Sequence, residues 1–329
     1  MGIVGATGAV GQEIVRLLEQ RRHFVKNLRC FASPKSVGKT LIFGEKNIQI
    51  EPINFEGVDL AFFCAGKKVS EKYIPEALKH GCLVVDSSSA FRMDPTVPLV
   101  IPEINPHAMD HHHGVIASPN CTATMMLMAI APLHRHVPVK RIVMSTYQAA
   151  SGAGYQAMQE LEEETRARLE SRPFTPTVMP HPYAFNLFAH NAPMTESSYN
   201  EEELKVIEES RKILEAPDLK IAVTCVRVPV LRAHSESLNV EFSAPLSTQK
   251  ACEILEKAPG VKLLEDWKNN RFPMPLDATG KDDVFVGRIR QDLSQPNTLD
   301  LWVVGDQLLK GAALNAVQIA ERLLTVTTS

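Results

Sequence analysis

The first twenty residues constrain the fold more than any other segment, because they combine a short apolar strand, a glycine turn and an amphipathic helix. Residues 3–4 are apolar and run directly into the turn Gly5-Ala6-Thr7-Gly8-Ala9-Val10-Gly11. Beyond the turn, apolar residues recur at the spacing of one helical face. Glycine allows the backbone to approach a pyrophosphate, and the helix N-terminus supplies free N–H groups and a positive dipole end. This pattern predicts a dinucleotide-binding βα unit; the alternative is a plain glycine-rich turn.

Further apolar runs continue the alternation of strand and helix. They predict strands at residues 28–32, 58–64, 82–85 and 114–117, and a helix at 70–80. Strands separated by helices indicate βαβ units and a parallel sheet. The first strand is short because the chain starts almost at the glycine turn. We therefore expect either a few further N-terminal residues or a different start codon.

The second half of the chain has longer segments between its strands. Strands are predicted at residues 142–148, 221–228, 238–244, 284–290 and 299–304, and helices at 155–169, 201–214, 248–257 and 311–324. We predict an α/β protein with two domains. A Rossmann-like dinucleotide-binding domain comprises residues 1–121 and 306–329, and an α+β catalytic and dimerisation domain with a mixed sheet comprises residues 122–305. The second sheet is expected to have an exposed face that needs covering, which favours a homodimer.

Composition excludes several classes of protein. Hydrophobic residues make up 44% and charged residues 22%, which is typical of a globular chain. The net charge of −3 gives no general affinity for nucleic acid. The longest apolar stretch, residues 123–133, has about half the length needed to cross a bilayer, and the first residues lack the basic region of a signal peptide. Six cysteines in so long a chain do not make a disulfide framework, so we expect free thiols and a cytoplasmic location.

Cys121 is the candidate nucleophile. It follows Ser118-Pro119-Asn120 and opens an apolar helix. A thiolate at a helix N-terminus is stabilised by the dipole and by backbone N–H groups, which can also bind an oxyanion. The alternative is a buried structural cysteine, which is the role we assign to the other five.

A thiol nucleophile requires a base, and the residues alone do not select one of the eleven histidines. His234 stands out because it lies in a short polar cluster with Arg227 and Arg232. A lone histidine is more often structural than catalytic.

The remaining histidines give no site. His181 and His190 fall in the proline-rich segment 173–193, which is predicted to be a long loop, and we expect both to be structural. The adjacent histidines at 111–113 seldom converge on one ion, so no metal site is predicted.

The residues after the second predicted strand bear on the choice of cofactor. An acidic residue there would favour NAD, because it binds the ribose 2′-hydroxyl. This chain has Ala32-Ser33-Pro34-Lys35-Ser36 instead. A cation and two hydroxyls suit a 2′-phosphate, hence NADP; the alternative is a solvated loop.

The chain resembles the aspartate-semialdehyde dehydrogenase family over nearly all of its length. Seven motifs of that family occur in order: GATGAVG at 5–11, SSAFR at 88–92, SPNCT at 118–122, YQAASGAG at 147–154, EELK at 202–205, RVPVLRAHSE at 227–236 and KGAALNAVQIAE at 310–321. The N-acetylglutamyl-phosphate reductases share the architecture but differ around the cysteine. The glyceraldehyde-3-phosphate dehydrogenases share the chemistry and lack the RAHSE stretch.

The resemblance implies the NADPH-dependent reductive dephosphorylation of L-aspartyl 4-phosphate to L-aspartate 4-semialdehyde. Cys121 would attack the acyl carbon, phosphate would leave, and hydride delivery to the thioester would follow. His234 would be the general acid/base, because the alkoxide formed must be protonated. The resemblance also implies a homodimer or a tetramer, of which we favour the homodimer, and a role in lysine, diaminopimelate, threonine and methionine biosynthesis, with no nucleic-acid or membrane partner.

The resemblance also assigns the remaining site residues. Gln148 would orient the acyl-enzyme, and Arg227 and Glu202 would hold the substrate carboxylate and amino group. The predicted phosphate-binding residues are Arg92, Asn120 and Lys205. The predicted cofactor-binding residues are Thr7, Gly8, Ala9, Val10, Lys35, Ser36, Ser151, Gly152 and Gln307. Without the resemblance, Glu202 and Lys205 would be an ordinary exposed helix pair and Arg92 a surface cation.

This chain departs from the family pattern at cofactor positions. Lys35 stands where the family usually has arginine, which keeps the charge but loses the planar fork. Gln307 stands where the family commonly has asparagine, which keeps the amide with a longer reach.

Two other functions fit the same residues less well. One is another acyl-phosphate reductase of the superfamily, but a substrate without an α-amino-acid head would not need both Arg227 and Glu202. The other is a non-enzymatic NADP-binding sensor, which would tolerate the loss of Cys121 or His234, and both are present.

Overall fold

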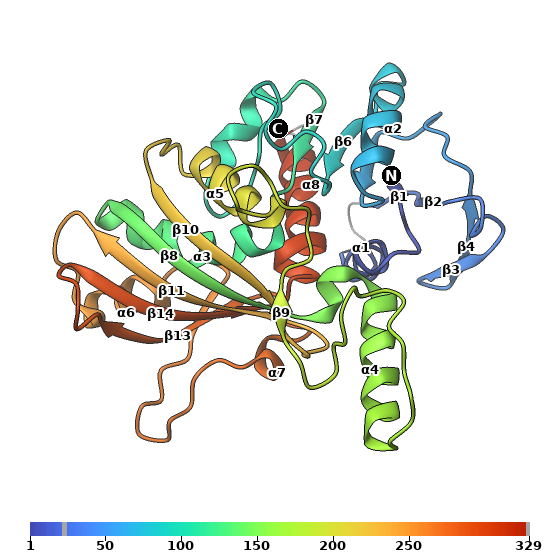
Figure 1. Cartoon of the computed structure of the whole chain (residues 1–329). Coiled ribbons are helices and arrows are strands. Elements are labelled where there is room, and N and C mark those ends of the chain that lie inside the picture. The colour runs from blue at the N-terminus through green and yellow to red at the C-terminus, as the bar shows by residue number, and fades with distance from the viewer. Residues whose placement is uncertain (22–24, 327–329) are drawn as a thin grey trace. The chain divides into compact units, whose positions relative to one another are not determined.

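The computed structural model describes residues 1–21 and 25–326 (Figure 1). Residues 22–24 and 327–329, which fall within the predicted domain of residues 1–121 and 306–329, lie outside the described residues. The chain divides into two units. Unit 1 comprises Met1–Asn120 and the segment from Gly311 onward, and unit 2 comprises Cys121–Lys310.

Unit 1 is built on a mostly parallel sheet, as the alternation of strands and helices predicts. Its strands are β1 (Gly2–Val4), β2 (Arg29–Phe31), β3 (Thr40–Phe43), β4 (Lys46–Glu51), β5 (Leu60–Phe63), β6 (Leu83–Asp86) and β7 (Val115–Ala117). Their order is β3-β4-β2-β1-β5-β6-β7, and all neighbours are parallel except β3 and β4. Every residue of β1 and β5 is buried, which is typical of strands covered on both faces.

The C-terminal segment returns to complete unit 1. The helices here are α1 (Ala9–Gln20), α2 (Lys67–Lys79) and α8 (Leu314–Val326), with a 3₁₀ helix at Pro106–His111. A π turn at Leu309–Ala313, which begins in unit 2, precedes α8. Helix α8 packs against α1 and β6. Asn315 on α8 is buried, and its Nδ2 donates to Val100 O and Ser118 Oγ, both at 2.9 Å.

Unit 2 contains a second sheet, which is mixed as predicted. Its strands are β8 (Val139–Gln148), β9 (Phe188–Ala189), β10 (Lys220–Arg227), β11 (His234–Phe242), β12 (Val261–Leu263), β13 (Val284–Gln291) and β14 (Thr298–Gly305). Their order is β12-β13-β14-β11-β8-β10-β9. The pairs β8–β10 and β12–β13 are parallel, and the other neighbours are antiparallel.

Helices cover one face of the second sheet. The helices of unit 2 are α3 (Cys121–His136), α4 (Tyr155–Leu169), α5 (Glu201–Ile213), α6 (Thr248–Glu256) and α7 (Pro275–Ala278), with a 3₁₀ helix at Ala150–Ala153. Helix α3 packs against β8, β11, β13 and β14, and also against α5 and α6. Buried side chains such as Met144, Leu238 and Leu301 fill this layer. None of the helices in the described ranges is both long and apolar enough to cross a membrane.

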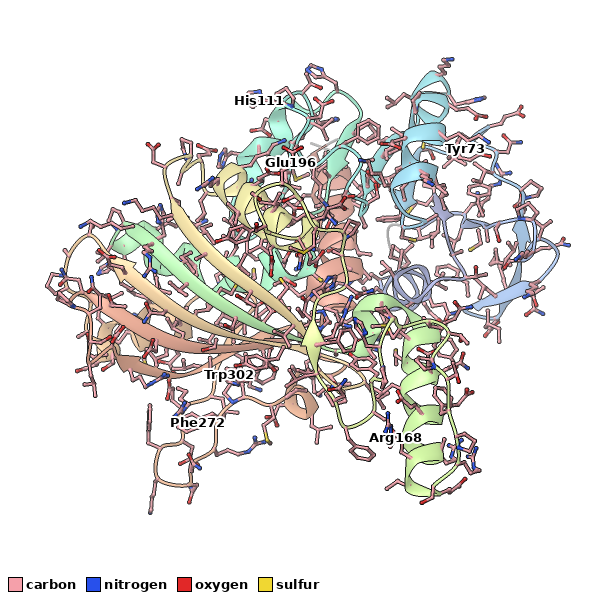
Figure 2. The ribbon with its side chains drawn as sticks, in the orientation of Figure 1. Tyr73, His111, Arg168, Glu196, Phe272 and Trp302 are labelled. Atoms are coloured by element: carbon pink, nitrogen blue, oxygen red, sulfur yellow. The ribbon has the colours of Figure 1, made fainter. Side chains whose placement is uncertain are left out.

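The opposite face of this sheet is more polar. Ser237 of β11 lies opposite Ser145 of β8 and Trp302 of β14. Trp302 contacts Tyr147, with their ring centroids 5.4 Å apart, and its Nε1 donates to Pro273 O at 2.9 Å. Figure 2 shows Trp302 next to the loop that carries Phe272. Tyr147 remains 37% exposed, so this face has room for a partner.

Two carboxylates of α4 hold the proline-rich segment 173–193 in place. Glu160 accepts hydrogen bonds from three successive backbone N–H groups, those of Thr177, Val178 and Met179, at 2.5, 2.7 and 2.7 Å. One turn further along α4, Glu164 accepts from the backbone of Tyr183 and Ala184 at 2.7 and 3.0 Å. The segment is therefore an ordered structure that is fixed to a helix, and it also contributes β9 to the sheet.

Candidate active site

Cys121 is the first residue of α3, so its thiol lies at the positive end of the helix dipole. It is partly buried and free of disulfide bonds. Its Sγ lies 3.8 Å from Thr122 Oγ1. The prediction that Cys121 opens an apolar helix is confirmed, because nearly every residue of α3 up to Leu133 is buried.

The other cysteines lie in environments that disfavour a thiolate. Burial raises the pKa of Cys30 to about 11 and the pKa of Cys64 and Cys82 to about 12. Burial also raises the pKa of Cys225 and of Cys252. These five thiols therefore stay protonated at neutral pH.

Gln148 links three elements of unit 2 through its side-chain amide. It ends β8 and is buried. Its Oε1 accepts from Thr146 Oγ1 at 3.1 Å, while its Nε2 donates to Thr122 Oγ1 at 3.2 Å and to Glu202 Oε1 at 3.4 Å. The amide is thus fixed between Thr122, the residue after Cys121, and the first turn of α5.

Arg227 ends β10 directly beside Gln148, because the parallel register pairs these two residues. Its guanidinium is buried, and Nη1 donates to Ala149 O at 3.2 Å. Its Nε is buried without a hydrogen-bond partner among the described residues. A buried, unsatisfied guanidinium nitrogen indicates that a ligand completes the contacts, and a carboxylate suits it best.

His234 is the first residue of β11 and is completely buried. Its Nδ1 accepts the backbone N–H of Ala149 at 3.0 Å, so the neutral ring carries its proton on Nε2. That Nε2 is buried and has no partner among the described residues. Burial above all, followed by the charges of Arg227 and His190, lowers the pKa of His234 well below 6.5.

The side chains of Arg227 and His234 both lie next to Gly152. A Cβ on Gly152 would stand 2.9 Å from Arg227 Nη1 and 2.9 Å from His234 Nε2. Both distances are shorter than real Cβ contacts, so this position accepts only glycine while both side chains keep their places. The absent side chain leaves the guanidinium and the imidazole facing the same space.

Glu202 and Lys205 lie in the first turn and a half of α5, which begins with a capping box. Asn200 Oδ1 accepts from Glu203 N at 3.0 Å, and Glu203 Oε2 accepts from Asn200 N at 2.9 Å. Lys205 Nζ lies 3.7 Å from Glu202 Oε2. Glu202 is buried and contacts Gln148, so it is not an ordinary exposed helix residue.

Gln307 and Ser151 are buried and contact each other. Gln307 Nε2 donates to Ser151 Oγ, and Gln307 Oε1 accepts from Ala233 N at 3.1 Å. Ala233 precedes His234 and has a left-handed φ of 72°. The amide of Gln307 therefore connects the turn before His234 to the turn that carries Ser151; its contact with a cofactor stays a prediction.

The glycine turn of unit 1 borders a cavity of about 750 Å³. Gly5 has φ 94°, and a Cβ on Gly11 would collide with Gly5 O, so both positions require glycine. The cavity is lined by Val4, Gly5, Thr7, Gly8, Ala32, Ser33, Pro34, Val37, Pro52, Ile53, Cys64, Ala65, Val69 and Tyr73. Its backbone-rich rim at the start of α1 and its size fit part of a dinucleotide.

The other predicted cofactor residues of unit 1 lie around this cavity. Ala9 and Val10 form the first turn of α1, directly after the lining residue Gly8. Lys35 and Ser36 lie between the lining residues Pro34 and Val37, and Lys35 is exposed. The lysine side chain can therefore reach an anionic group placed at the mouth of the cavity.

Two of the predicted phosphate-binding residues, Arg92 and Asn120, belong to unit 1 and are both buried. Arg92 donates from Nε to Ser118 O at 2.9 Å and from Nη2 to Ser87 O at 2.8 Å. These contacts fix the guanidinium beside the loop that leads to Asn120. Asn120 immediately precedes Cys121 in the chain.

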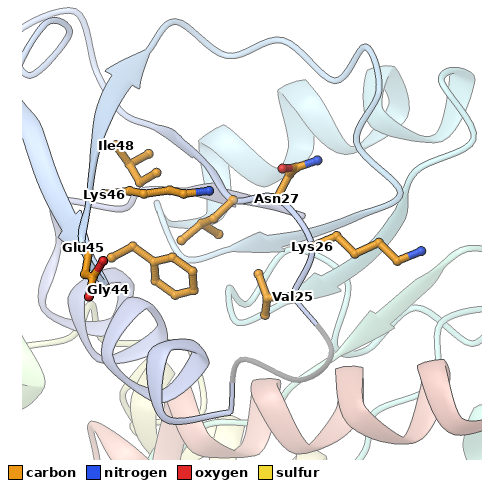
Figure 3. Close-up of a pocket in the computed structure, with 9 residues that line it drawn as sticks. Val25, Lys26, Asn27, Gly44, Glu45, Lys46 and Ile48 are labelled. Carbon is orange, nitrogen blue, oxygen red and sulfur yellow. The ribbon is translucent and has the colours of Figure 1, made fainter.

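A second cavity in unit 1 contains none of the predicted site residues (Figure 3). It measures about 430 Å³ and lies between residues 25–28 and the β3–β4 hairpin. The side chain of Lys26 points away from the other lining residues. Among the described residues, no group of three or more histidine, cysteine or acidic side chains is arranged for a metal ion, including those at 111–113.

The structure places His190 near the charged side chains of Arg227, Glu202 and Lys205, although the sequence predicts a structural role for it. Burial and the charge of Arg227 lower the pKa of His190 to about 4, with Glu202 opposing and Lys205 adding to the shift. These charged partners come from β10 and α5 and are distant in sequence. No local pattern around His190 could have revealed them.

Two family models cover most of the chain. Residues 1–112 match the model described as "Semialdehyde dehydrogenase, NAD binding domain". Residues 130–310 match "Semialdehyde dehydrogenase, dimerisation domain".

Individual relatives match over the whole length. An aspartate-semialdehyde dehydrogenase from Synechocystis is 54% identical, with 98% of this chain and 97% of the relative covered. One from Bacillus subtilis is 43% identical, with 98% and 96% covered. The crystal structure of aspartate semialdehyde dehydrogenase II from Vibrio cholerae, complexed with ASA, is 38% identical and superposes with a TM-score of 0.96, covering 98% of this chain and 97% of that one.

Proposed function

Since the chain belongs to the aspartate-semialdehyde dehydrogenase family, we propose that it reduces L-aspartyl 4-phosphate to L-aspartate 4-semialdehyde and phosphate. The observation that carries this proposal is the arrangement of unit 2. A thiol at a helix N-terminus, a buried guanidinium with an unsatisfied Nε and a buried imidazole with an unsatisfied Nε2 belong to one network around Gln148, Ala149 and Gly152. The family matches do not favour another acyl-phosphate reductase or a non-enzymatic sensor.

Substrate binding follows from charge. Arg227 would hold the α-carboxylate through its unsatisfied guanidinium nitrogen. Glu202 would hold the amino group through its negative charge. It is buried, and its Oε1 and Oε2 lie near Gln148 and Lys205. Lys205, Arg92 and Asn120 would bind the phosphate, two of them cations that offset its charge.

The first chemical step is acyl transfer to sulfur. The Cys121 thiolate attacks the acyl carbon, the carbon–oxygen bond to phosphate breaks, and phosphate leaves with the electron pair. The positive end of the α3 dipole would stabilise the oxyanion that forms during attack. Gln148 would orient the acyl group, since its amide is fixed next to Thr122.

The second step reduces the thioester. NADPH supplies the hydride when bound. His234 would donate a hydrogen bond from Nε2–H to the oxyanion formed at the former carbonyl. We assign it the role of general acid/base at this atom, because it shares this proton with the oxygen and takes it back as the hemithioacetal collapses. Collapse of the hemithioacetal breaks the carbon–sulfur bond, releases the aldehyde and returns the thiolate of Cys121.

We assign NADP to the cavity of unit 1. Thr7, Gly8, Ala9 and Val10 would hold the pyrophosphate at the start of α1, and Lys35 and Ser36 would contact the 2′-phosphate. Ser151, Gly152 and Gln307 would lie by the nicotinamide. The domain boundaries we propose are residues 1–121 with 306–329 for cofactor binding and 122–305 for catalysis and dimerisation.

We further propose a homodimer and a cytoplasmic location. Unit 2 matches a dimerisation domain, and the polar face of its sheet around Trp302 and Tyr147 is suited to a second copy. None of the six cysteines forms a disulfide in the described structure, which fits a reducing compartment. The product would feed the biosynthesis of lysine, diaminopimelate, threonine and methionine.

The test is the reverse reaction, with Cys121→Ala as control. Purified enzyme receives L-aspartate 4-semialdehyde, NADP⁺ and phosphate, and the absorbance of NADPH is followed. Phosphate-dependent NADPH formation by the wild type and its loss in Cys121→Ala support the proposal. A wild-type protein that binds NADPH but does not turn over this aldehyde contradicts it.

A further inference from the structure

His190 lies at the edge of the second sheet, next to the substrate-binding strand. Strand β9 runs antiparallel to β10 and pairs Phe188 with Arg227 and Ala189 with Val226. The next residue, His190, donates its backbone N–H to Cys225 O at 2.8 Å. Residues that face each other across two strands point to the same side of a sheet. His190 therefore lies on the side of Cys225 and Arg227, the side that α5 covers.

Charged groups from every neighbouring element act on His190. Arg227 comes from β10, Glu202 and Lys205 come from α5, and His234 of β11 is itself affected by His190. Burial and Arg227 together keep the imidazole neutral at physiological pH, because they lower its pKa to about 4. A neutral imidazole among two cations and one carboxylate can act as a hydrogen-bond donor without adding charge.

Hydrogen bonds fix the orientation of this imidazole. Nδ1 accepts the backbone N–H of Ala192 at 3.1 Å, so the proton of the neutral ring is on Nε2. The carbonyl oxygen of His190 accepts from Asn200 Nδ2 at 3.3 Å, and Asn200 caps α5. His190 is thus held by its backbone N–H, its carbonyl and one ring nitrogen, which leaves Nε2–H as its donor.

We propose that His190 is a further substrate-binding residue, whose Nε2–H donates to the substrate α-carboxylate alongside Arg227. The cation supplies the charge, and the neutral donor adds a directional contact from the adjacent strand. This inference rests on the proposed function, since it concerns the same substrate. The proposal concerns His190 and not His181, because the side chain of His181 is exposed and contacts the ring of Phe188.

Two substitutions separate substrate binding from a structural role. In His190→Gln, an amide nitrogen can occupy the place of Nε2, but the acceptor for Ala192 N–H is lost. In His190→Asn, an amide oxygen can still accept from Ala192 N–H, but no donor reaches the position of Nε2. A structural role of His190 therefore predicts rescue by asparagine, whereas contact with substrate predicts rescue by glutamine. His136→Gln, at the exposed end of α3, is the matched control.

The measurement is steady-state kinetics of the reverse reaction for the wild type and these three variants, with circular dichroism to check folding. His190→Asn should raise KM for L-aspartate 4-semialdehyde by about tenfold, as expected for the loss of a hydrogen bond to a charged group. Its kcat should stay within about twofold, KM for phosphate should not change, and His190→Gln should recover most of the loss.

The outcomes are distinguishable from those for the proposed function. An inactive wild-type enzyme overturns the proposed function, and the role of His190 with it. An active wild type with an unchanged KM in His190→Asn overturns the role of His190 alone. A rise confined to KM for phosphate, or rescue by asparagine rather than glutamine, also overturns it.

Discussion

The backbone N–H of Ala149 donates to Nδ1 of His234 at 3.0 Å, and this contact decides which ring nitrogen carries the proton. An imidazolium would place a second N–H against that of Ala149 and would be buried beside the Arg227 guanidinium. The active site therefore holds His234 neutral, with its single proton on Nε2.

This arrangement predicts the pH dependence of catalysis. Because the pKa of His234 is well below 6.5, the ring stays neutral throughout the neutral and alkaline range. We expect the pH profile of kcat to show no ionisation near 6.5 that belongs to His234. His234→Asn, whose Oδ1 can still accept from Ala149, should lose about 10²- to 10⁴-fold in kcat. A change of kcat with pH near 6.5 that is seen in the wild type and is absent in His234→Asn would contradict the prediction.

Gly152→Ala should disable the site without unfolding the protein. The new Cβ would stand 2.9 Å from both Arg227 Nη1 and His234 Nε2, and the imidazole is completely buried. We expect kcat/KM to fall about 100-fold, since displacements of about 1 Å carry costs of that order. Ala153→Ser, an exposed position in the same turn, is the control. Equal kinetics in the two variants would show that the contacts can relax.

Glu160→Gln should loosen the proline-rich segment. Burial raises the pKa of Glu160, but the backbone hydrogen bonds from Thr177, Met179 and Val178 outweigh it, and the net pKa is below 4.5. A depressed pKa means stability that is present above 4.5 and is lost as pH falls through the folded value. At pH 7 we expect a loss of about 1–3 kcal/mol.

Urea unfolding and limited proteolysis check this prediction. The difference between Glu160→Gln and wild type should shrink below about pH 4.5, and cleavage within residues 173–193 should be faster in the variant at pH 7. Glu162→Gln, exposed on the same helix, should behave as wild type. A constant difference at all pH values would mean that the charge of Glu160 is not involved.

Glu236→Gln should stabilise the protein at high pH. Glu236 is completely buried, and neither carboxyl oxygen has a hydrogen-bond partner in the described part of the chain, so burial raises its pKa well above 4.5. Stability from such a group is complete below the unfolded pKa and is lost as pH rises through the folded pKa. Glutamine mimics the neutral acid and removes this loss.

The free energy of unfolding at two pH values tests the role of Glu236. The variant should gain about 1 kcal/mol or more at pH 8, roughly 2–4 °C in Tm, and little at pH 4.5. A destabilised variant at pH 8 would show that Glu236 is ionised and paired.

Short-range signals were the predictable part of this structure. The glycine turn and the helix that opens at Cys121 are each encoded within about a dozen neighbouring residues, and both form as expected. The β3–β4 hairpin was not predicted. Its strand β3 carries the short apolar run Leu41-Ile42-Phe43, but these side chains are only partly buried or exposed, and in β4 only Ile50 is buried. Strand β9 could not be predicted either, since its two residues become a strand only by pairing with β10.

In the candidate site too, local features could be predicted, whereas contacts between distant segments could not. Strand β11 begins at His234 rather than at residue 238, because Ser235 and Glu236 pair with β8 despite their polarity. The burial of Glu202 and its contact with Gln148 depend on how α5 packs, which no pattern in EELK reveals. The candidate roles of these residues came from the family resemblance, and their contacts came from the fold.

The two-residue strand β9 bears on which parts of the segment 173–193 can change during evolution. It connects one position of a long irregular segment to β10, while the segment is anchored elsewhere by Glu160 and Glu164. The stretches between these anchors can change in length and sequence while the nucleophile and its strands stay as they are. With the role we propose for His190, a single exchange at position 190 would alter the preference for the substrate head group and leave Cys121 and His234 unchanged.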